Sequence, residues 1–411
     1  MTLLYNIGIA FLQLGFHIAS LFSAKAKASI AGRKDLIRKI QKALQNQSGQ
    51  RVWIHCASLG EFEQGRPVIE ALRKEFGALK VLITFFSPSG YEVRKNYKEA
   101  DHVFYLPWDT ARNASEFIAA ANPTVAIFVK YEFWYHYSSE LKARGIPTIS
   151  ISSIFRPEQA FFKPQGGFYR RILTNFDHFF VQNKASQQLL KSIGIDQCTV
   201  AGDTRFDRVY AIAQDGGEIP IAKAFKADQK TMVAGSCWPE DVEALTPMIN
   251  EGKTKFILAP HEITETFLKQ VEQALRVKSI RYSMVADQRV EDYQVLIIDN
   301  IGLLSRLYRY GEFAFVGGAF GKGLHNILEA ACYGIPIFFG NKSYERFQEA
   351  RDLIERGGAF AVGDQKELKE KFEMVSLPEN FLPACEITRA YVVENLGATE
   401  KIMEYCRKVL R

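Results

Sequence analysis

The strongest constraint on the fold is a regular alternation of short apolar runs with longer amphipathic stretches, which starts at residue 51 and restarts at residue 230. Short apolar runs are typical of buried strands, and longer amphipathic stretches are typical of helices. Their alternation predicts parallel sheets with helices on both faces, the doubly wound α/β class. We expect strands at residues 51–57, 80–86, 102–106, 124–129, 148–152 and 178–182, and then at 230–234, 255–259, 294–298, 313–316 and 336–339.

The alternation weakens over residues 210–229, a stretch that contains glycines and a proline. Such a stretch is typical of a linker, and 411 residues are enough for two or three domains. Two doubly wound domains are expected to form a cleft at the carboxyl ends of their strands, where ligands bind in such sheets. The predicted order is a membrane-associated helix over 1–24, an α/β domain over 25–209, a linker over 210–229, a second α/β domain over 230–385, and C-terminal helices over 386–411.

The first 24 residues contain no Asp, Glu, Lys or Arg, and a cluster of Lys and Arg follows from Lys25 onward. About 20 apolar residues can cross a bilayer. A secretory signal peptide would carry basic residues before its apolar core, and none is present. The basic cluster on the C-terminal side predicts that the rest of the chain is cytoplasmic. We therefore expect residues 1–24 to form a helix that associates with the membrane.

Two other interpretations of this helix stay open. Asn6, Gln13, His17 and Ser20 fall on one helical face, which is typical of a helix that lies on the membrane surface. The helix could also be buried in a soluble fold. The net charge of +6, from 52 basic and 46 acidic residues, suits an anionic membrane or substrate but is too small to indicate nucleic acid. The six cysteines have no zinc-site spacing, so we expect free thiols.

A candidate general base follows the first predicted strand, in the sequence His55-Cys-Ala-Ser-Leu-Gly-Glu61. Gly60 would permit a tight turn there. Glu61 would then lie in the first helical turn, where the helix dipole keeps a carboxylate ionised. An ionised carboxylate in a cleft can accept a proton from a hydroxyl nucleophile. The alternative is that Glu61 only stabilises the start of the helix.

A glycine-rich loop follows the strand at 313–316, with four glycines in the seven positions 317–323. Backbone N–H groups at such a turn can bind a phosphate. His325 and Glu329 are four residues apart, so they would share a helical face, and Glu329 could accept hydrogen bonds from ribose hydroxyls. The spacing matches neither the dinucleotide fingerprint nor the Walker A loop. The alternative is a purely structural turn.

Other polar residues follow predicted strands, and each allows two interpretations. Ser236 could cap a helix or contact a phosphate, and His261 could contact a base or be a structural histidine. Arg205 could bind an anionic group or pair with Asp203 or Asp207. Glu132 and Trp134 follow the strand at 124–129. Exposed aromatic groups beside a charge suit an amphiphilic acceptor, but these residues could equally belong to the core and its rim.

In their order along the chain, these segments resemble the Kdo transferases, which move 3-deoxy-D-manno-oct-2-ulosonic acid (Kdo) from CMP-Kdo to the lipid A precursor. The resemblance covers nearly the whole chain. It is carried by Trp53-x-His55, Ser58-Leu59-Gly60-Glu61, Ser87-Pro88-Ser89-Gly90, Leu106-Pro107-Trp108-Asp109, Glu132-Phe133-Trp134, Gly202-Asp203-Thr204-Arg205-Phe206, Ala234-Gly235-Ser236, Phe315-Val316-Gly317-Gly318 and His325-Asn326-x-Leu328-Glu329.

The resemblance implies a GT-B fold, in which two Rossmann-like domains bind the acceptor and the nucleotide sugar, respectively. It implies inverting transfer to lipid IVA with Glu61 as the catalytic base, no cofactor, no nucleic-acid partner, and a location on the cytoplasmic face of the inner membrane. No Asp-x-Asp motif follows a predicted strand, so we expect the transfer to be metal-independent. The acceptor would contact Ser58, Gly60, Ser89, Glu132 and Trp134. The donor CMP-Kdo would contact Ser236, Pro260, His261, Gly317, Gly318, Gly323, His325, Asn326, Glu329 and Arg205.

The chain departs from the family pattern at several of these positions. Arg205 stands where the family has Lys, and Lys130 stands where many members have an acidic residue. Many members have Pro-Arg-His where this chain has Pro260-His261-Glu262, so His261 takes the place of either the Arg or the His. Two rival functions remain: another GT-B transferase or an epimerase acting on a nucleotide sugar, and a non-catalytic, membrane-tethered nucleotide-binding protein.

Overall fold

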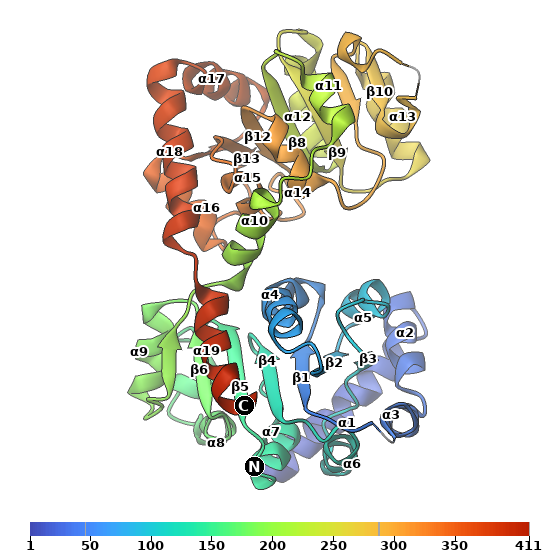
Figure 1. Ribbon diagram of the computed structural model, residues 1–411, viewed down its shortest axis with the longest axis vertical. Coiled ribbons are helices and arrows are strands. Elements are labelled where there is room, and N and C mark those ends of the chain that lie inside the picture. Colours follow the sequence, from blue (N-terminus) through green and yellow to red (C-terminus); the bar gives the residue numbers. More distant parts are fainter. Residues whose placement is uncertain (46, 287, 411) are drawn as a thin grey trace. The chain divides into compact units, whose positions relative to one another are not determined.

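The computed structural model describes residues 1–45, 47–286 and 288–410, and the chain divides into two compact units (Figure 1). The first unit comprises Met1–Asp207 together with Gly397–Arg411, and the second comprises Arg208–Leu396. The boundary falls inside helix α10 (Thr204–Gln214) rather than in a linker. The prediction of an irregular linker at 210–229 is therefore wrong, because this stretch contains the end of α10 and helix α11 (Pro220–Lys226).

The first unit has a seven-stranded parallel sheet in the order β3-β2-β1-β4-β5-β6-β7. All six predicted strands are present, and the short edge strand β7 is an addition. The strands are β1 (Arg51–Cys56), β2 (Lys80–Phe85), β3 (His102–Tyr105), β4 (Val125–Val129), β5 (Thr148–Ser153), β6 (His178–Val181) and β7 (Cys198–Val200).

Helices cover both faces of this sheet, as the alternating pattern predicts (Figure 1). Successive residues of β1 point to opposite faces, so Trp53 packs in one core cluster while Val52 and Ile54 pack in the other. The helices of this unit before α10 are α1 (Thr2–Ala19), α2 (Ala24–Arg33), α3 (Leu36–Leu44), α4 (Leu59–Glu75), α5 (Pro88–Arg94), α6 (Ala111–Ala121), α7 (Tyr135–Ala143), η1 (Ala160–Phe162), α8 (Gly167–Leu173) and α9 (Lys184–Ser192).

The second unit also has a seven-stranded parallel sheet, in the order β10-β11-β9-β8-β12-β13-β14. The five predicted strands form its centre, and β10 and β14 are added at the two edges. The strands are β8 (Thr231–Cys237), β9 (Lys255–Pro260), β10 (Ser279–Arg281), β11 (Val295–Ile297), β12 (Phe313–Val316), β13 (Ile337–Gly340) and β14 (Ala359–Val362).

Helices surround this second sheet as well (Figure 1). Helices α12, α13 and α17 contribute Leu245, Val271 and Leu368 to a core cluster with strand residues such as Phe315. The helices are α12 (Pro239–Asn250), α13 (Glu265–Ala274), η2 (Tyr282–Met284), η3 (Val290–Asp292), α14 (Leu304–Leu307), η4 (Tyr308–Tyr310), α15 (Leu328–Ala331), α16 (Gln348–Arg356), α17 (Gln365–Val375) and α18 (Pro378–Glu394).

The C-terminal segment breaks at residues 395–397, as expected, and then returns to the first unit as α19 (Ala398–Leu410). Ala398, Ile402 and Met403 join the core cluster of the first sheet that also contains α4 residues. Asp207 holds the start of α19, because its carboxylate accepts hydrogen bonds from the N–H groups of Gly397 (2.7 Å) and Thr399 (2.6 Å). The two predicted C-terminal helices therefore belong to different units.

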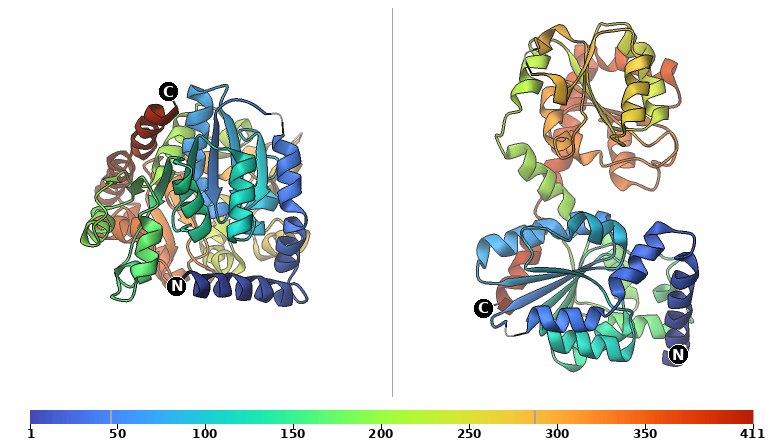
Figure 2. Two further views of the ribbon diagram at one scale, coloured as in Figure 1. Left: turned by 90° about the horizontal axis from the view of Figure 1, so that it is seen from below. Right: turned by 90° about the vertical axis from the view of Figure 1, so that its right-hand side faces the viewer.

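Helix α1 is long and apolar enough, by length and composition, to cross a membrane. Figure 2 shows it along the outside of the first unit in both views. Ile9 is the buried residue of this helix, and most of its other side chains are exposed or half-buried. The interpretation as a buried helix of a soluble fold is therefore wrong. All six cysteines have free thiols, as expected.

Candidate active site

In each sheet the chain begins at a central strand, adds strands on one side of it and then, after a reversal, on the other, and the predicted site residues except Arg205 lie near this point. In the first sheet the reversal lies between β1 and β4, and in the second between β8 and β12. Doubly wound sheets bind ligands at the carboxyl ends of the strands beside such a reversal. Ser58, Gly60 and Glu61 follow β1, Ser89 follows β2, and Glu132 and Trp134 follow β4. We call these the β1/β4 edge, and the corresponding part of the second unit the β8/β12 edge.

Glu61 lies in the first turn of α4, as predicted, but its carboxylate is not simply ionised. Burial, helped by the nearby Glu132 carboxylate, raises the pKa of Glu61 to about 7. The N–H of Ala57 donates a hydrogen bond to the carboxylate, and this contact and Lys130 lower the pKa by less than burial raises it. The expectation that the helix dipole keeps Glu61 ionised is therefore wrong. Glu61 instead exchanges a proton near neutral pH, which suits a general base.

The predicted turn at Gly60 is also wrong. Gly60 is the second residue of α4 and has no positive φ, so its position does not require glycine for conformational reasons. Ser58 is the N-cap residue, with an extended backbone. Glu63 points away from Glu61 as expected, because it pairs with Arg94 (2.9 Å) on another face of α4.

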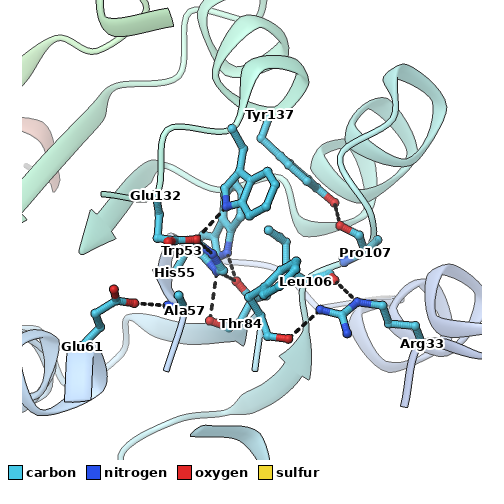
Figure 3. Close-up of polar contacts among 12 residues, drawn as sticks. Arg33, Trp53, His55, Ala57, Glu61, Thr84, Leu106, Pro107, Glu132 and Tyr137 are labelled. Atoms are coloured by element: carbon cyan, nitrogen blue, oxygen red, sulfur yellow. Dashed lines mark hydrogen bonds and ion pairs between the residues drawn. The ribbon is translucent and has the colours of Figure 1, made fainter. Parts of the chain in front are cut away.

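Glu132 sits at the centre of a buried polar chain that the sequence did not reveal (Figure 3). Its carboxylate oxygen Oε2 lies 3.0 Å from His55 Nε2 and accepts a hydrogen bond from Trp134 Nε1 at 2.7 Å. The Nδ1 of His55 lies 2.9 Å from Thr84 Oγ1, which itself accepts a hydrogen bond from Trp53 Nε1. The Nδ1 of His55 also lies 3.1 Å from the Thr84 carbonyl oxygen, so Thr84 contacts this side of the ring through two atoms.

This chain fixes the position of Glu132 beside Glu61. His55, Thr84 and Trp53 are fully buried, so their polar atoms depend on one another for hydrogen bonds. A signal for His55 was present, since a polar residue in the otherwise apolar strand 52–56 is uncommon without a partner. Glu132 and Trp134 are half-buried and form the more exposed end of this chain, with Glu132 joining Trp134 to His55. Ser89 lies at the same sheet edge, where its hydroxyl contacts Ser87 at 2.9 Å.

Arg205 pairs with Asp203, one of the two acidic partners considered from the sequence. Its Nη2 lies 2.9 Å from Asp203 Oδ2, and the Arg205 N–H donates to Asp203 Oδ1. Asp203 is buried and also accepts a hydrogen bond from Gln64 (2.9 Å), and Arg205 keeps the pKa of this carboxyl low despite burial. Arg205 lies in the first unit, whereas the other predicted donor-binding residues lie in the second.

At the β8/β12 edge, three rings from three strand ends form one stack. His261 follows β9 and stacks on Trp238, which follows β8, with ring centroids 4.2 Å apart. His325, in the loop after β12, also stacks on His261, with ring centroids 4.5 Å apart. Trp238 Nε1 also donates a hydrogen bond to His325 Nε2 (3.1 Å).

This contact determines which nitrogen of the neutral His325 ring carries the proton. Its Nε2 accepts the indole hydrogen bond, so the neutral ring carries its proton on Nδ1. Burial, with the neighbouring His261, lowers the pKa of His325 to about 4, and burial also lowers the pKa of His261. Both imidazoles are therefore neutral at pH 7 and can act on a ligand through stacking and hydrogen bonding rather than through charge.

Asp241 holds the glycine-rich loop to the start of α12, and sequence reasoning missed it. Its fully buried carboxylate accepts hydrogen bonds from the N–H groups of Trp238 (2.8 Å) and Gly318 (2.8 Å). Asp241 thus caps the start of α12, a role considered for Ser236 from the sequence. Ser236 instead has a φ of +56° beside the irregular pairing of β8 and β9. Burial raises the pKa of Asp241 to about 6.

The glycines allow close backbone approach rather than supplying free amides. A Cβ on Gly317 would lie 2.4 Å from the carbonyl oxygen of Ser236, and one on Gly318 would lie 2.3 Å from that of Gly323. The N–H groups of Gly317, Gly318 and Gly323 already donate to Gly235, Asp241 and Gly318. Phosphate binding by this loop stays a prediction, and these three N–H groups already have partners within the protein. The loop is a tight scaffold that presents the residues after it.

The predicted shared helical face of His325 and Glu329 is wrong as well. Helix α15 begins only at Leu328, so His325 and Asn326 lie in the loop before it. Asn326 accepts the Leu328 N–H and donates to Glu329 Oε1, both at 3.3 Å. The structure nevertheless brings Ser236, Pro260, His261, the glycines, His325, Asn326 and Glu329 to the ends of the adjacent strands β9, β8 and β12.

The chain is similar in sequence to known transferases. Residues 31–208 match the model of 3-deoxy-D-manno-octulosonic-acid transferase (kdotransferase). The 3-deoxy-D-manno-octulosonic acid transferase of Aquifex aeolicus is 28% identical over 347 residues, which are 82% of this chain and 89% of the relative. The enzyme of the same name from Chlamydia trachomatis serovar D is 25% identical over 380 residues, 89% of this chain and 87% of the relative.

Solved structures agree on the fold. UDP-GlcNAc 2-epimerase from Neisseria meningitidis has a TM-score of 0.61 at 18% identity, covering 87% of this chain and 100% of that one. MurG from Acinetobacter baumannii has a TM-score of 0.55 at 10% identity, covering 88% and 100%. The fold is GT-B-like, with two doubly wound parallel sheets. The N-terminal part of the chain matches the Kdo transferase model, and over most of its length the chain is similar to curated Kdo transferases.

Proposed function

We propose that the protein transfers Kdo from CMP-Kdo to a lipid A precursor, lipid IVA, with inversion at the anomeric carbon. The family match and the relatives support the transferase activity. The observation that carries the mechanism is Glu61, a carboxyl group with a pKa of about 7 at the β1/β4 edge. A base whose pKa lies near the working pH is deprotonated often enough to act and still basic enough to take a proton.

The proposed step is a single displacement. The Glu61 carboxylate takes the proton of a sugar hydroxyl on the acceptor, and that oxygen attacks the anomeric carbon of Kdo. The new C–O bond forms as the bond from that carbon to the phosphate oxygen breaks, and CMP leaves with the electron pair. Glu132, held by His55 and Trp134, raises the pKa of Glu61, so the proton taken is held firmly enough to assist the attack.

In this proposal, CMP-Kdo binds at the β8/β12 edge. The neutral, stacked His261 and His325 offer an aromatic surface for the cytosine or ribose and an Nδ1–H donor for a polar oxygen. Asn326 and Glu329 provide further hydrogen-bonding groups beside them. Arg205 is proposed to contact the Kdo carboxylate or phosphate while it remains paired with Asp203. Metal independence is part of the proposal, and retained activity in EDTA would support it.

The test is a mass spectrum of the acceptor lipid. Purified protein is incubated with tetraacylated lipid A precursor and CMP-Kdo generated in situ, beside a Glu61→Ala variant. A mass gain of Kdo with the wild type alone supports both the transfer and the base. A gain with both proteins keeps the transfer and removes Glu61 from its role. No gain with a folded preparation overturns the proposal and favours another nucleotide-sugar enzyme of this fold.

A further inference from the structure

Helix α1 has two faces of opposite character. Leu4, Ile7, Phe11, Leu14 and Ile18 are spaced three and four residues apart, so they form one row along the helix. They are 42–67% exposed, an unusual degree for five large apolar side chains in a row. Leu21 and Phe22 extend this row beyond the helix end and are 76% and 87% exposed. We call these seven residues the outward row.

The opposite face of α1 is attached to the first unit by hydrogen bonds. The Tyr5 hydroxyl donates to Asp109 Oδ2 at 2.5 Å. Asp109 is 2% exposed, and its other partners are the backbone N–H groups of His136 and Tyr137, each at 3.1 Å. Asn6 Oδ1 lies 2.6 Å from His136 Nε2. Tyr5 and Asn6 of α1 are therefore partners of buried groups in the domain.

Aromatic packing extends this attachment along the helix. The Tyr5 ring lies against Tyr135 and Phe168, with centroids 5.5 and 5.7 Å apart. Three turns later, Phe16 packs edge-on against Phe86 and Trp108, at 5.9 and 5.3 Å. Both ends of α1 are thus fixed to the same domain, which holds the helix along its surface (Figure 2).

This attachment is incompatible with a transmembrane orientation. A helix that crossed the bilayer would withdraw Tyr5 from Asp109 and leave a buried carboxylate without its side-chain donor. It would also place Tyr5 and Asn6 in hydrocarbon without their present partners. We infer that α1 lies parallel to the membrane, with the outward row buried in one leaflet and the opposite face kept on the protein. The partner of this surface is an anionic lipid bilayer.

The charge distribution supports this partner. Residues 1–44 contain seven Lys or Arg and one Asp, a net charge of +6, which equals the net charge of the whole chain. Lys25, Lys27 and Lys34 are exposed directly after the outward row. Lysines at the border of a buried apolar helix attract anionic lipid headgroups. The remaining residues, 45–411, are electrically balanced, so the attraction to lipid is concentrated beside α1.

Depth measurements test the orientation. Leu4, Phe11 and Ile18 are replaced by Cys in three separate full-length variants, with Cys332 and Cys385 changed to Ala, and each is labelled with an environment-sensitive fluorophore. Lipids carrying quenchers at known depths are included in vesicles of phosphatidylethanolamine and phosphatidylglycerol. We expect the same depth at all three positions. A spanning helix would separate positions 4 and 18 by about 21 Å along the membrane normal, and that result would overturn the inference.

Binding measurements test the surface itself. Phe11→Glu is expected to bind the same vesicles roughly 10–100-fold more weakly, because a large apolar side chain no longer enters the leaflet. The control is Met374→Glu, an equally apolar-to-acidic change at a 45% exposed position of α17 in the second unit, which should bind as the wild type does. Unchanged binding by Phe11→Glu, or no vesicle binding by the wild type, overturns the inference.

Activity separates this inference from the proposed catalysis. Phe11 lies outside the proposed site, so Phe11→Glu should still transfer Kdo to an acceptor dissolved in detergent micelles while losing activity on vesicles. If the wild type fails in both media but binds vesicles at a uniform depth, the proposed transfer is wrong and the membrane orientation stands.

Discussion

The β1/β4 edge carries carboxylates in a buried polar network, whereas the β8/β12 edge carries glycines, a buried aspartate and three stacked rings. Both edges lie at the same topological position of a parallel sheet. At the first, burial brings the pKa of an acid to about 7, and at the second, it keeps two imidazoles neutral. The comparison shows how one topology places chemically different groups in the two units, through the residues that follow each strand.

The largest expected effect tests whether the two functions are separate. Glu61→Gln keeps the size and the Ala57 hydrogen bond but cannot accept a proton, so transfer should fall by about 10²–10⁴-fold. CMP affinity, measured by calorimetry, should stay within about twofold of the wild type, because the proposed nucleotide site lies in the other unit. A large loss of CMP affinity would show that Glu61 also serves the donor.

The second prediction concerns the glycine loop alone. Gly318→Ala places a Cβ 2.3 Å from the Gly323 carbonyl at a φ of +96°, so we expect about 1–3 kcal/mol of destabilisation and clearly weaker CMP binding. Urea unfolding and calorimetry measure the two effects. Gly321→Ala is the matched control, since nothing lies within 4 Å of its Cβ and its φ is not positive. Equal effects of both changes would contradict the tight-scaffold role.

The third prediction uses pH to examine the carboxylate edge. Only the deprotonated form of Glu61 accepts a proton, so the transfer rate should rise with pH through a midpoint near 7. Glu132→Gln removes a negative neighbour and should move this midpoint to lower pH. Lys130→Met removes a positive neighbour and should move it to higher pH.

Rates over pH 5–9 at saturating substrate measure these shifts. If the midpoint of the pH profile shifts in opposite directions in the two variants, both residues act on Glu61 through direct electrostatic coupling. Movement in the same direction would point to a general disturbance of the β1/β4 edge.

The smallest expected effect concerns the ring stack. Trp238→Phe keeps an aromatic surface for His261 but removes the donor to His325 Nε2. We expect a loss of about 1 kcal/mol in CMP binding, a mixture of His325 tautomers in ¹⁵N NMR spectra, and a rise in the pKa of His325, because the neutral form loses a hydrogen bond. An unchanged tautomer would show that another group fixes the ring.

The sequence predicted the central strands and the edge on which each candidate residue lies, because strand ends follow directly from the apolar pattern. It did not predict β7, β10 and β14, which are only three or four residues long and lie at or next to sheet edges. It placed Glu61 correctly but not its protonation, since that depends on burial by residues distant in the chain. His55–Thr84–Trp53 joins two strands, and Asp241–Gly318 joins a helix start to a distant loop, so no local pattern identifies these partners.

Because α19 belongs to the first unit, this unit can be completed only after the whole second unit has been synthesised. Residues 398–410 supply part of a core whose other members belong to the first half of the chain. The Asp207 carboxylate likewise accepts its hydrogen bonds from the N–H groups of Gly397 and Thr399, which are made late in synthesis. At about 5–20 residues per second, the ribosome spends roughly 10–40 s on the 189 residues of Arg208–Leu396 before this segment is made. The unit that is synthesised first is therefore the last to be completed, and it waits with an apolar surface uncovered while its apolar N-terminal helix is already available to the membrane.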